Sequence, residues 1–203
     1  RIEYRPSRPG GDTRPLSDSA LDNHWKAIRS FWKWAEESLG ASRPDMTLPR
    51  AKYQLPVITP FTEIEIKALL SACEYSNEYN NPRTQKAYRT RRPTAARDSA
   101  LILLLLDTGL RVSEVTRLEV GHVDMSAGAV TVIPHGSGQK TKPRIVYLGK
   151  SARRALWRYL ASREGITPSE ALFLTDEGAR LGENQIRHML QNLGTRAGVK
   201  DCH

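Results

Sequence analysis

The chain has 203 residues, enough for one sizeable core or for one domain and part of another. Its 39% hydrophobic and 26% charged residues are ordinary for a globular protein, but 31 basic against 22 acidic residues give a net charge of +9. That balance favours a polyanionic partner, either a nucleic acid or an anionic membrane surface. The longest apolar run, residues 100–106, is far shorter than the roughly 20 residues that cross a bilayer, so we expect no membrane-spanning segment.

Two further features bear on the compartment. Cys73 and Cys202 lack any metal-ligand spacing, so the sequence predicts neither a disulfide framework nor a zinc site. Residues 1–15 are polar and rich in proline and glycine, without the apolar core of a signal peptide. We therefore expect a reducing, cytoplasmic compartment and no membrane partner.

Residues 17–39 have the pattern of an amphipathic helix. A serine, Ser17 or Ser19, can cap its start, and a glycine follows its last residue. The apolar positions that share one face are Leu21, Trp25, Ile28, Trp32 and Leu39. Residues 44–60 contain four prolines and little periodicity, which predicts a linker. Because one helix cannot form a core alone, we interpret residues 1–43 as part of a larger helical domain.

Residues 61–203 have the dense pattern of a second domain. Thr62 and Glu65 form a capping box, residues 100–106 should lie in a buried central helix, and period-two alternation after Asp124 predicts a hairpin with a basic tip. The predicted helices cover 63–73, 98–107, 112–118, 151–163 and 183–196, the predicted strands cover 129–133 and 143–148, and a polar, basic segment covers 74–94. The predicted fold class is mainly α with a small antiparallel β-hairpin or sheet (α+β).

Arg111 follows the buried helix and a glycine turn, at the start of the next helix. A guanidinium there has a rigid base, its fork matches two phosphate oxygens, and the helix N-terminus beside it also favours anions. Glu114, one turn later, could support Arg111 or cap the helix. An ordinary surface ion pair is the alternative, because the Arg-x-x-Glu spacing alone is common.

Lys140 and Lys142 lie between the two predicted strands, and Arg144 follows them. A lysine on a two-stranded tip is well placed to reach a phosphodiester and to donate a proton to a leaving alkoxide. A solvated, charged turn would have the same composition.

The order of these pieces is more specific than any one of them. A buried Leu-rich helix, Thr-Gly-Leu-Arg-Val-Ser-Glu at 108–114, an acidic turn at Asp124 and a basic hairpin ending in Arg-Ile-Val-Tyr-Leu at 144–148 follow one another. This series resembles the catalytic domain of the tyrosine recombinase (phage integrase) family. A third interpretation, an RNA-binding or membrane-surface protein explained by charge alone, does not account for the ordered motif.

The resemblance extends from Thr62 to about Val199, and residues 194–199 are similar to the approach to the family's His-x-x-Arg motif. More weakly, residues 21–39, with Phe-Trp-Lys-Trp at 31–34, resemble the last helix of the family's core-binding domain. The resemblance thus implies three parts. They are the C-terminal part of a helical, DNA-binding core-binding domain at 1–43, a linker at 44–60, and a catalytic domain at 61–203 that is incomplete at its C-terminus.

The resemblance also implies the reaction. Family members attack a DNA phosphodiester with a tyrosine, form a 3′-phosphotyrosyl link and free a 5′-hydroxyl that later attacks a partner strand. Two arginines and a His or Lys stabilise the pentavalent phosphate, a hairpin lysine acts as general acid, and no metal or nucleotide cofactor is needed. Carried over, Arg111 is the first arginine and Glu114 the supporting carboxylate. Lys140 is the lysine, with Lys142 as the alternative because hairpin length varies.

One departure limits this expectation. The chain ends at His203, before any match to the second arginine, and none of its seven tyrosines has the context of the nucleophile. We therefore expect the chain as written to bind DNA without cleaving it. The alternative is a non-enzymatic, truncated DNA-binding protein that occupies recombination sites. A complete member is expected to act as a homotetramer on two DNA duplexes.

Family members hold duplex DNA between two domains, so basic side chains should gather on the surfaces that face it. We expect phosphate contacts from the segment 74–94, which position the protein without reading sequence, although a disordered basic loop is the alternative. The helix at 17–39 could enter the major groove. The expected DNA contacts are Lys26, Arg29, Lys33, Arg83, Lys86, Arg89, Arg91, Arg92 and Arg144.

Overall fold

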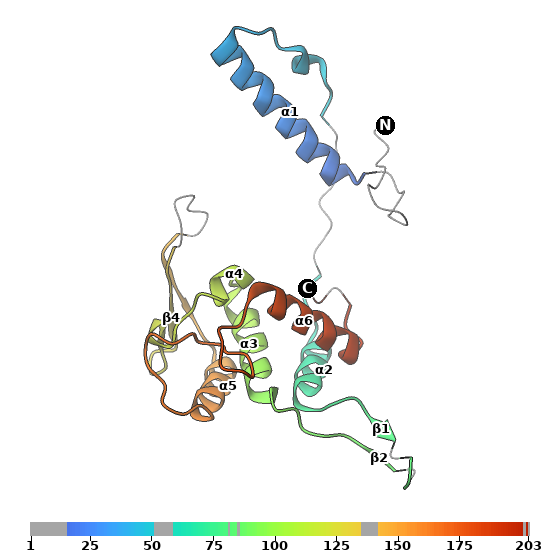
Figure 1. Ribbon diagram of the computed structural model, residues 1–203, viewed down its shortest axis with the longest axis vertical. Helices are drawn as coiled ribbons and strands as arrows, with labels where there is room; N and C mark the ends of the chain where they lie inside the picture. The colour runs from blue at the N-terminus through green and yellow to red at the C-terminus, as the bar shows by residue number, and fades with distance from the viewer. Residues whose placement is uncertain are drawn as a thin grey trace. The chain divides into compact units, whose positions relative to one another are not determined.

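The structure, a computed structural model, describes residues 16–50, 59–80, 82–84, 86–134, 142–200 and 202 (Figure 1). The chain divides into two compact units, Arg1–Thr59 and Pro60–His203, and each is described by itself. Within the described ranges, every helix is too short or too polar to span a bilayer.

The first unit is built on helix α1, Asp18–Leu39, which confirms the helix predicted over 17–39. Ser17 caps it by accepting a hydrogen bond from the backbone N–H of Ala20 (3.2 Å). Gly40, at φ 63°, ends it in the left-handed conformation. A short 3-10 helix, η1 (Pro44–Thr47), follows inside the segment predicted to be a linker and packs against α1.

Two buried carboxylates, Asp45 and Asp22, hold the segment 43–50, which contains η1, to α1. Asp45 in η1 accepts hydrogen bonds from two nitrogens of Arg43 (3.1 and 2.8 Å) and lies 3.7 Å from Nε of Arg29 in α1. Asp22 in α1 lies 2.7 Å from Arg50 Nε and 2.7 Å from Lys26 Nζ. The hydrogen bond from Arg50, and then the one from Lys26, lower the pKa of Asp22 to about 2.

The second unit contains the remaining elements. Its helices are α2 (Glu63–Glu74), α3 (Ala95–Thr108), α4 (Val112–Val115), the 3-10 helix η2 (Val120–His122), α5 (Lys150–Ala161) and α6 (Glu183–Ala197). Its strands are β1 (Tyr79–Asn80), β2 (Ala87–Tyr88), β3 (Val123–Asp124), β4 (Ala129–Val132) and β5 (Arg144–Tyr147). β1 and β2 form one antiparallel pair, and β3, β4 and β5 form an antiparallel sheet in that order.

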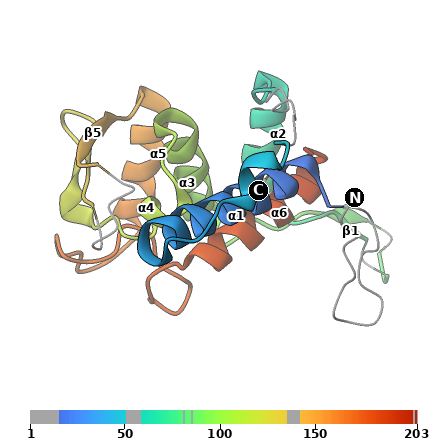
Figure 2. The same ribbon diagram turned by 90° about the horizontal axis from the view of Figure 1, so that it is seen from above.

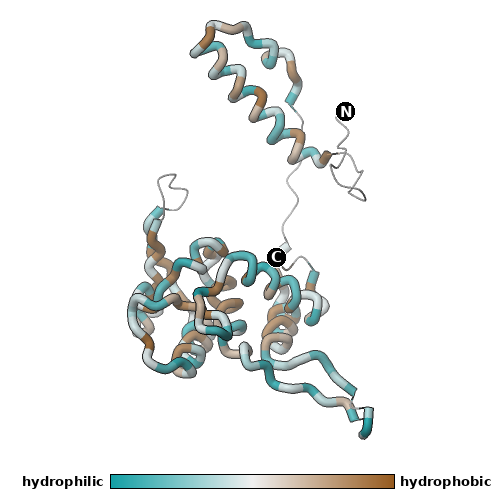
Figure 3. Tube along the Cα trace, viewed as in Figure 1, coloured by the Kyte–Doolittle hydropathy of each residue, from teal (hydrophilic) through white to brown (hydrophobic). Residues whose placement is uncertain are grey.

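The core of the second unit surrounds α3, as the apolar sequence of that helix predicts. Leu101 and Leu104 are fully buried, and α5 lies alongside α3 (Figure 2), while Val130 of β4 packs into the same cluster. A second cluster joins α2 to α6 through residues that include Leu69. Burial is not complete around α3, because Leu106 is 39% exposed. In Figure 3 apolar segments concentrate in these central helices, whereas the β1–β2 hairpin is mostly hydrophilic.

The predicted fold class, mainly α with a small antiparallel sheet, is confirmed. Four details differ. α3 begins at Ala95 instead of residue 98, and α4 ends at Val115 instead of residue 118. The segment predicted only as polar and basic contains the β1–β2 hairpin, and β3 adds a third strand to the sheet.

Candidate functional site

Arg111 lies on the turn from α3 to α4. Gly109 ends α3 at φ 60°, a conformation that residues with a side chain rarely adopt, and Leu110, only 5% exposed, anchors the turn in the core. Arg111 is the N-cap residue of α4, and its side chain is 65% exposed. The local sequence therefore sets a solvent-accessible guanidinium on a short, anchored turn.

Glu114 is a buried neighbour of this arginine. Its side chain is only 2% exposed, and its Oε2 accepts the backbone N–H of Arg111 (2.9 Å), which closes the first turn of α4. Its Oε1 lies 3.4 Å from Arg111 Nη1, a long contact. Both contacts that the sequence left open, capping of the helix and contact with the guanidinium, occur together.

Arg144 completes the cluster from the sheet. Its Nη1 and Nη2 donate to Glu114 Oε1 (3.0 Å) and Oε2 (2.8 Å), a bidentate pair. The hydrogen-bonded Glu114 carboxylate raises the pKa of the Arg144 guanidinium above its usual value. Sequence reasoning expected Arg144 to contact DNA and missed this pair, because the pairing of β4 with β5 brings the two residues together across 30 positions of chain.

We call Arg111, Glu114 and Arg144 the Arg–Glu–Arg cluster. Of the two candidate lysines, Lys140 lies outside the described residues. Lys142 is exposed and precedes Arg144 by two positions, next to the first residue pair of β5 with β4.

A groove borders the Arg–Glu–Arg cluster. It has a volume of about 470 Å³, and its lining includes Glu114, Arg117, His122 and Arg180. Arg180 donates to the Thr116 carbonyl oxygen (2.8 Å), so one of its nitrogens fastens the end of α4. Sequence reasoning did not single out Arg117 or Arg180, which lie outside the motif it used. The described residues contain no group of three or more His, Cys, Asp or Glu side chains that could hold a metal ion.

A model of the phage integrase family matches residues 60–203. This chain belongs to that family of tyrosine recombinases. It is 30% identical over 188 residues to the tyrosine recombinase XerC of Yersinia pestis, covering 91% of this chain and 55% of that protein. It is 38% identical over 110 residues to XerC of Pseudomonas fluorescens, covering 54% and 36%. The chain thus matches about half, or less, of the length of these curated relatives.

Solved recombinases have a similar fold. The XerA recombinase is 25% identical and aligns with a TM-score of 0.55 over 93% of this chain and 58% of its own. The Tn1549 transposon integrase, solved in complex with circular intermediate DNA, is 17% identical and aligns with a TM-score of 0.65 over 90% and 59%. The mainly α fold with its small sheet is thus the fold of known tyrosine recombinases.

The basic side chains of this integrase-family chain at 83–92 differ in their surroundings. Arg83, Lys86 and Arg91 are exposed on or near the β1–β2 hairpin, which projects from the body of the second unit (Figure 1). Arg92 instead donates to the Cys73 carbonyl oxygen (3.3 Å) and lies 3.0 Å from Asp98. Arg92 is therefore held against the body of the unit, while the other three are open to solvent.

Asp98 is the centre of a second buried ion cluster that sequence reasoning did not find. It is 0% exposed and accepts hydrogen bonds from Thr94 Oγ1 (2.8 Å) and Arg97 Nε (2.9 Å), besides its contact with Arg92. Arg97 also donates to the Leu174 carbonyl oxygen (3.1 Å). These contacts join the start of α3 to segments on two sides, which indicates a structural role.

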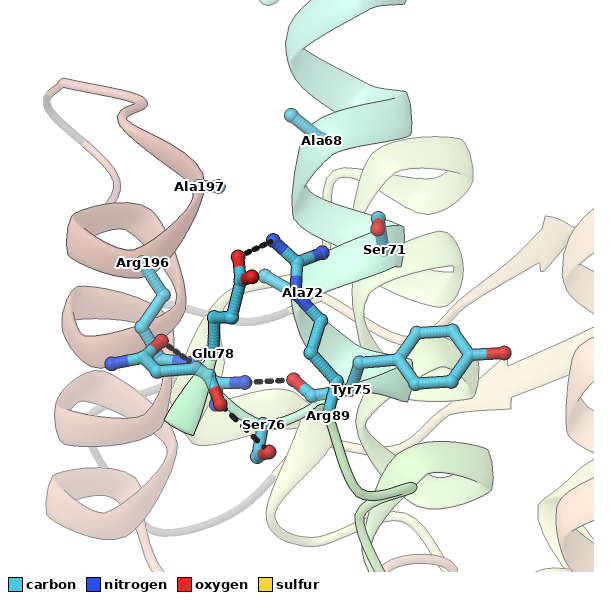
Figure 4. Close-up of a pocket in the computed structure, with 10 residues that line it drawn as sticks. Ala68, Ser71, Ala72, Tyr75, Ser76, Glu78, Arg89, Arg196 and Ala197 are labelled. Carbon is cyan, nitrogen blue, oxygen red and sulfur yellow. Dashed lines mark hydrogen bonds and ion pairs between the residues drawn. The ribbon is translucent and has the colours of Figure 1, made fainter. Parts of the chain in front are cut away.

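Arg89 lies at a pocket between α2, the hairpin and α6 (Figure 4). Its guanidinium is 3.8 Å from the carboxylate of Glu78, and both side chains are more than half exposed. On the other side of the pocket, Arg196 of α6 donates to Asn77 Oδ1 (3.2 Å) and to the Tyr75 carbonyl oxygen. Arg196 thereby fastens the base of the hairpin to α6.

The three cations expected on α1 also differ from one another. Lys26 pairs with the buried Asp22, and Lys33 makes a loose pair with Glu37 (3.8 Å). Arg29 stacks over the Trp25 ring, 4.9 Å from its centroid. Lys33 is the most exposed of the three, with 66% of its side chain accessible.

Proposed function

We propose that the complete protein is a site-specific DNA recombinase that cleaves and rejoins strands through a 3′-phosphotyrosyl intermediate. The observation that carries this is an exposed arginine, Arg111, on an anchored turn beside a buried and compensated carboxylate. A guanidinium held there can bind two oxygens of a phosphodiester and stabilise the charge that develops on them. The XerC relatives are named as tyrosine recombinases, and the Tn1549 integrase was solved on DNA, which supports the same activity here.

In the proposed reaction a tyrosine oxygen attacks the phosphorus, and the bond to the 5′ oxygen breaks. Arg111 holds the non-bridging oxygens, and a lysine gives its proton to the leaving 5′ oxygen. Lys140 is the candidate for that lysine, with Lys142 as the alternative. The 5′-hydroxyl of a partner strand then attacks the phosphotyrosyl bond and releases the tyrosine. No tyrosine of the 203 residues matches the nucleophile, so we expect this chain alone to bind duplex DNA without cleaving it.

The proposed domains follow one another along the chain. Residues 61–203 form the catalytic domain, and residues 1–43 form part of a core-binding domain connected by a linker at 44–60. The exposed hairpin cations Arg83, Lys86 and Arg91 supply phosphate contacts. We propose a homotetramer on two DNA duplexes for the complete protein.

The test uses the product of the complete open reading frame. DNA fragments that the protein retains from a genomic library identify a binding site. The experimenter then nicks one strand of that DNA near the bound site. Cleavage of this strand releases a short end, so the covalent protein–DNA adduct accumulates. Arg111→Ala should reduce adduct formation by about 100-fold or more, because one oxyanion contact is lost, while binding of the same DNA changes little.

Arg154→Ala, which removes the same charge from an exposed position on α5, is the control and should cleave like the wild type. Cleavage that survives Arg111→Ala would show that another group grips the phosphate. A wild-type protein that binds duplex DNA but never forms the adduct would favour the non-enzymatic DNA-binding protein.

A further inference from the structure

The Arg–Glu–Arg cluster is asymmetric. Glu114 makes a short bidentate pair with Arg144 (2.8 and 3.0 Å) but only a 3.4 Å side-chain contact with Arg111. Exposure follows the same order, since the side chain of Arg144 is 35% exposed and that of Arg111 is 65% exposed. One carboxylate therefore lies between two guanidinium groups and holds one of them much more firmly.

Burial of Glu114 makes this asymmetry important. A carboxylate that is 2% exposed is costly to leave without a cation, so it will pair with whatever positive group can reach it. The side chain of Arg111 is already at 3.4 Å. If Arg144 were absent, a small rotation of Arg111 would complete a bidentate pair with Glu114. Such a pair would use two of the five N–H donors of Arg111, balance its charge and turn it away from a phosphate.

We propose that Arg144 is a positioning residue for strand cleavage: by saturating Glu114, it leaves the Arg111 guanidinium available for the phosphate. This inference rests on the proposed function. It also reassigns Arg144, which the sequence placed among the DNA contacts. Two of the five N–H donors of Arg144 are used by Glu114, and the carboxylate balances its charge, which weakens its attraction for a phosphate.

The sheet explains why Arg144 can do this reliably. Arg144 is the first residue of β5 and pairs with Val132 of β4, whose side chain is buried in the core. Its backbone is therefore fixed by the register of two strands rather than by the turn that carries Arg111. The two arginines reach the carboxylate from independently anchored elements.

Neutralising Glu114 should rescue the loss of Arg144. In the complete protein, Arg144→Ala should reduce adduct formation by about 100-fold, as expected for a displaced catalytic group. Adding Glu114→Gln should restore at least about tenfold, because a neutral amide no longer captures Arg111 but can still accept its backbone N–H. Glu114→Gln alone should remain closer to the wild type than Arg144→Ala does. Rates are compared at saturating DNA, well below each variant's unfolding temperature.

A second measurement on the 203-residue chain needs no activity. Phenylglyoxal modifies accessible arginines, and mass spectrometry follows its addition to Arg111. Arg144→Ala should slow modification of Arg111 several-fold, since the guanidinium becomes paired, and Arg144→Ala with Glu114→Gln should restore the wild-type rate. Loss of folding would do the opposite and speed the modification.

The outcomes separate the possibilities. If Arg144→Ala weakens DNA binding in proportion to its loss of cleavage, and Glu114→Gln does not rescue it, Arg144 is a DNA contact and the inference fails. In an Arg144→Ala chain whose circular dichroism spectrum matches that of the wild type, unchanged or faster modification of Arg111 also overturns it. Absence of cleavage by the wild type would refute the proposed function, whereas the modification rates would still decide the role of Arg144.

Discussion

At the scale of single residues, the predicted DNA contacts in the second unit fall into two groups, exposed side chains and side chains that contact a buried carboxylate. Arg83, Lys86 and Arg91 are exposed, and Arg92 and Arg144 contact buried carboxylates. Composition and spacing identify all five as basic residues near the expected DNA surface. They do not reveal a buried partner, because that depends on how α3 and β5 pack. The motif around Arg111 is local in sequence, whereas the partner of Arg144, Glu114, is 30 positions away and could not be predicted from spacing.

Arg92→Ala should therefore act on stability more than on DNA binding. It removes one of the cations that compensate Asp98, while Thr94 and Arg97 remain, so we expect a loss of about 2 kcal/mol in the free energy of unfolding. Chemical denaturation followed by circular dichroism measures this loss. The matched control is Arg91→Ala, one position away and exposed, which should unfold like the wild type but bind DNA more weakly. Equal stabilities for the two variants would contradict the structural role of Arg92.

At the scale of elements, predictions succeeded where the signal is local. The helix caps at Ser17 and Thr62 and the glycine ends at Gly40 and Gly109 agree with the structure. α4 is shorter than its sequence predicts because the chain tightens after Val115. The N–H groups of Arg117 and Leu118 donate to the carbonyls of Glu114 and Val115 (both 3.1 Å), three residues back, so α-helical bonding does not continue to residue 118. The hairpin strands β1 and β2 are exposed on both faces, so they have no alternating pattern to detect.

The ion pairs of α1 predict an acid transition in the first unit. The pKa of Asp22 is lowered to about 2 in the folded chain, against about 4 in an unfolded one, so its contribution to stability is present above about pH 4. It is lost as the pH falls toward 2. Three of the four tryptophans lie in α1, so a Trp157→Phe background makes fluorescence report on that unit alone.

In that background, acidification from about pH 4 to 2 should shift Trp fluorescence toward that of the solvated indole, as Arg50 and Lys26 lose their charged partner. Asp22→Asn should start with the weakened structure at neutral pH and show a smaller change over this range. Identical pH profiles for the chains with and without the Asp22→Asn substitution would exclude Asp22 as the group responsible.

At the scale of the whole molecule, the net charge of +9 predicted a polyanionic partner before any element was known. The resemblance to tyrosine recombinases is confirmed by the family match over residues 60–203. What composition could not supply is the distribution of the charge, because several arginines stabilise the fold instead of facing solvent. Only the three-dimensional arrangement separates those two uses.

The salt dependence of DNA binding tests this distribution. Binding of the chain to duplex DNA should weaken steeply as the salt concentration rises. If Lys86 contacts one phosphate, Lys86→Ala should reduce the magnitude of the slope of log K for binding against log salt concentration by about one unit. The effect should be similar on unrelated sequences, since a phosphate contact reads none. Lys67→Ala is the control, because Lys67 is exposed on α2 but paired with Glu63 (2.7 Å), and it should leave the slope unchanged. Equal slopes for Lys86→Ala and the wild type would contradict the phosphate contact proposed for Lys86 on the hairpin.

The Arg–Glu–Arg cluster also has a defined net charge. Two guanidinium groups and one carboxylate sum to a single positive charge, which balances the single negative charge of a resting phosphodiester. In the proposed reaction, attack by a tyrosinate adds a second negative charge to the pentavalent phosphate. This cluster alone cannot neutralise that charge, so another cation must be close by when the bond breaks. In the proposed reaction the charge of the cluster thus matches that of the bound phosphodiester, and the additional negative charge of the transition state would be balanced by cations elsewhere in the complete protein.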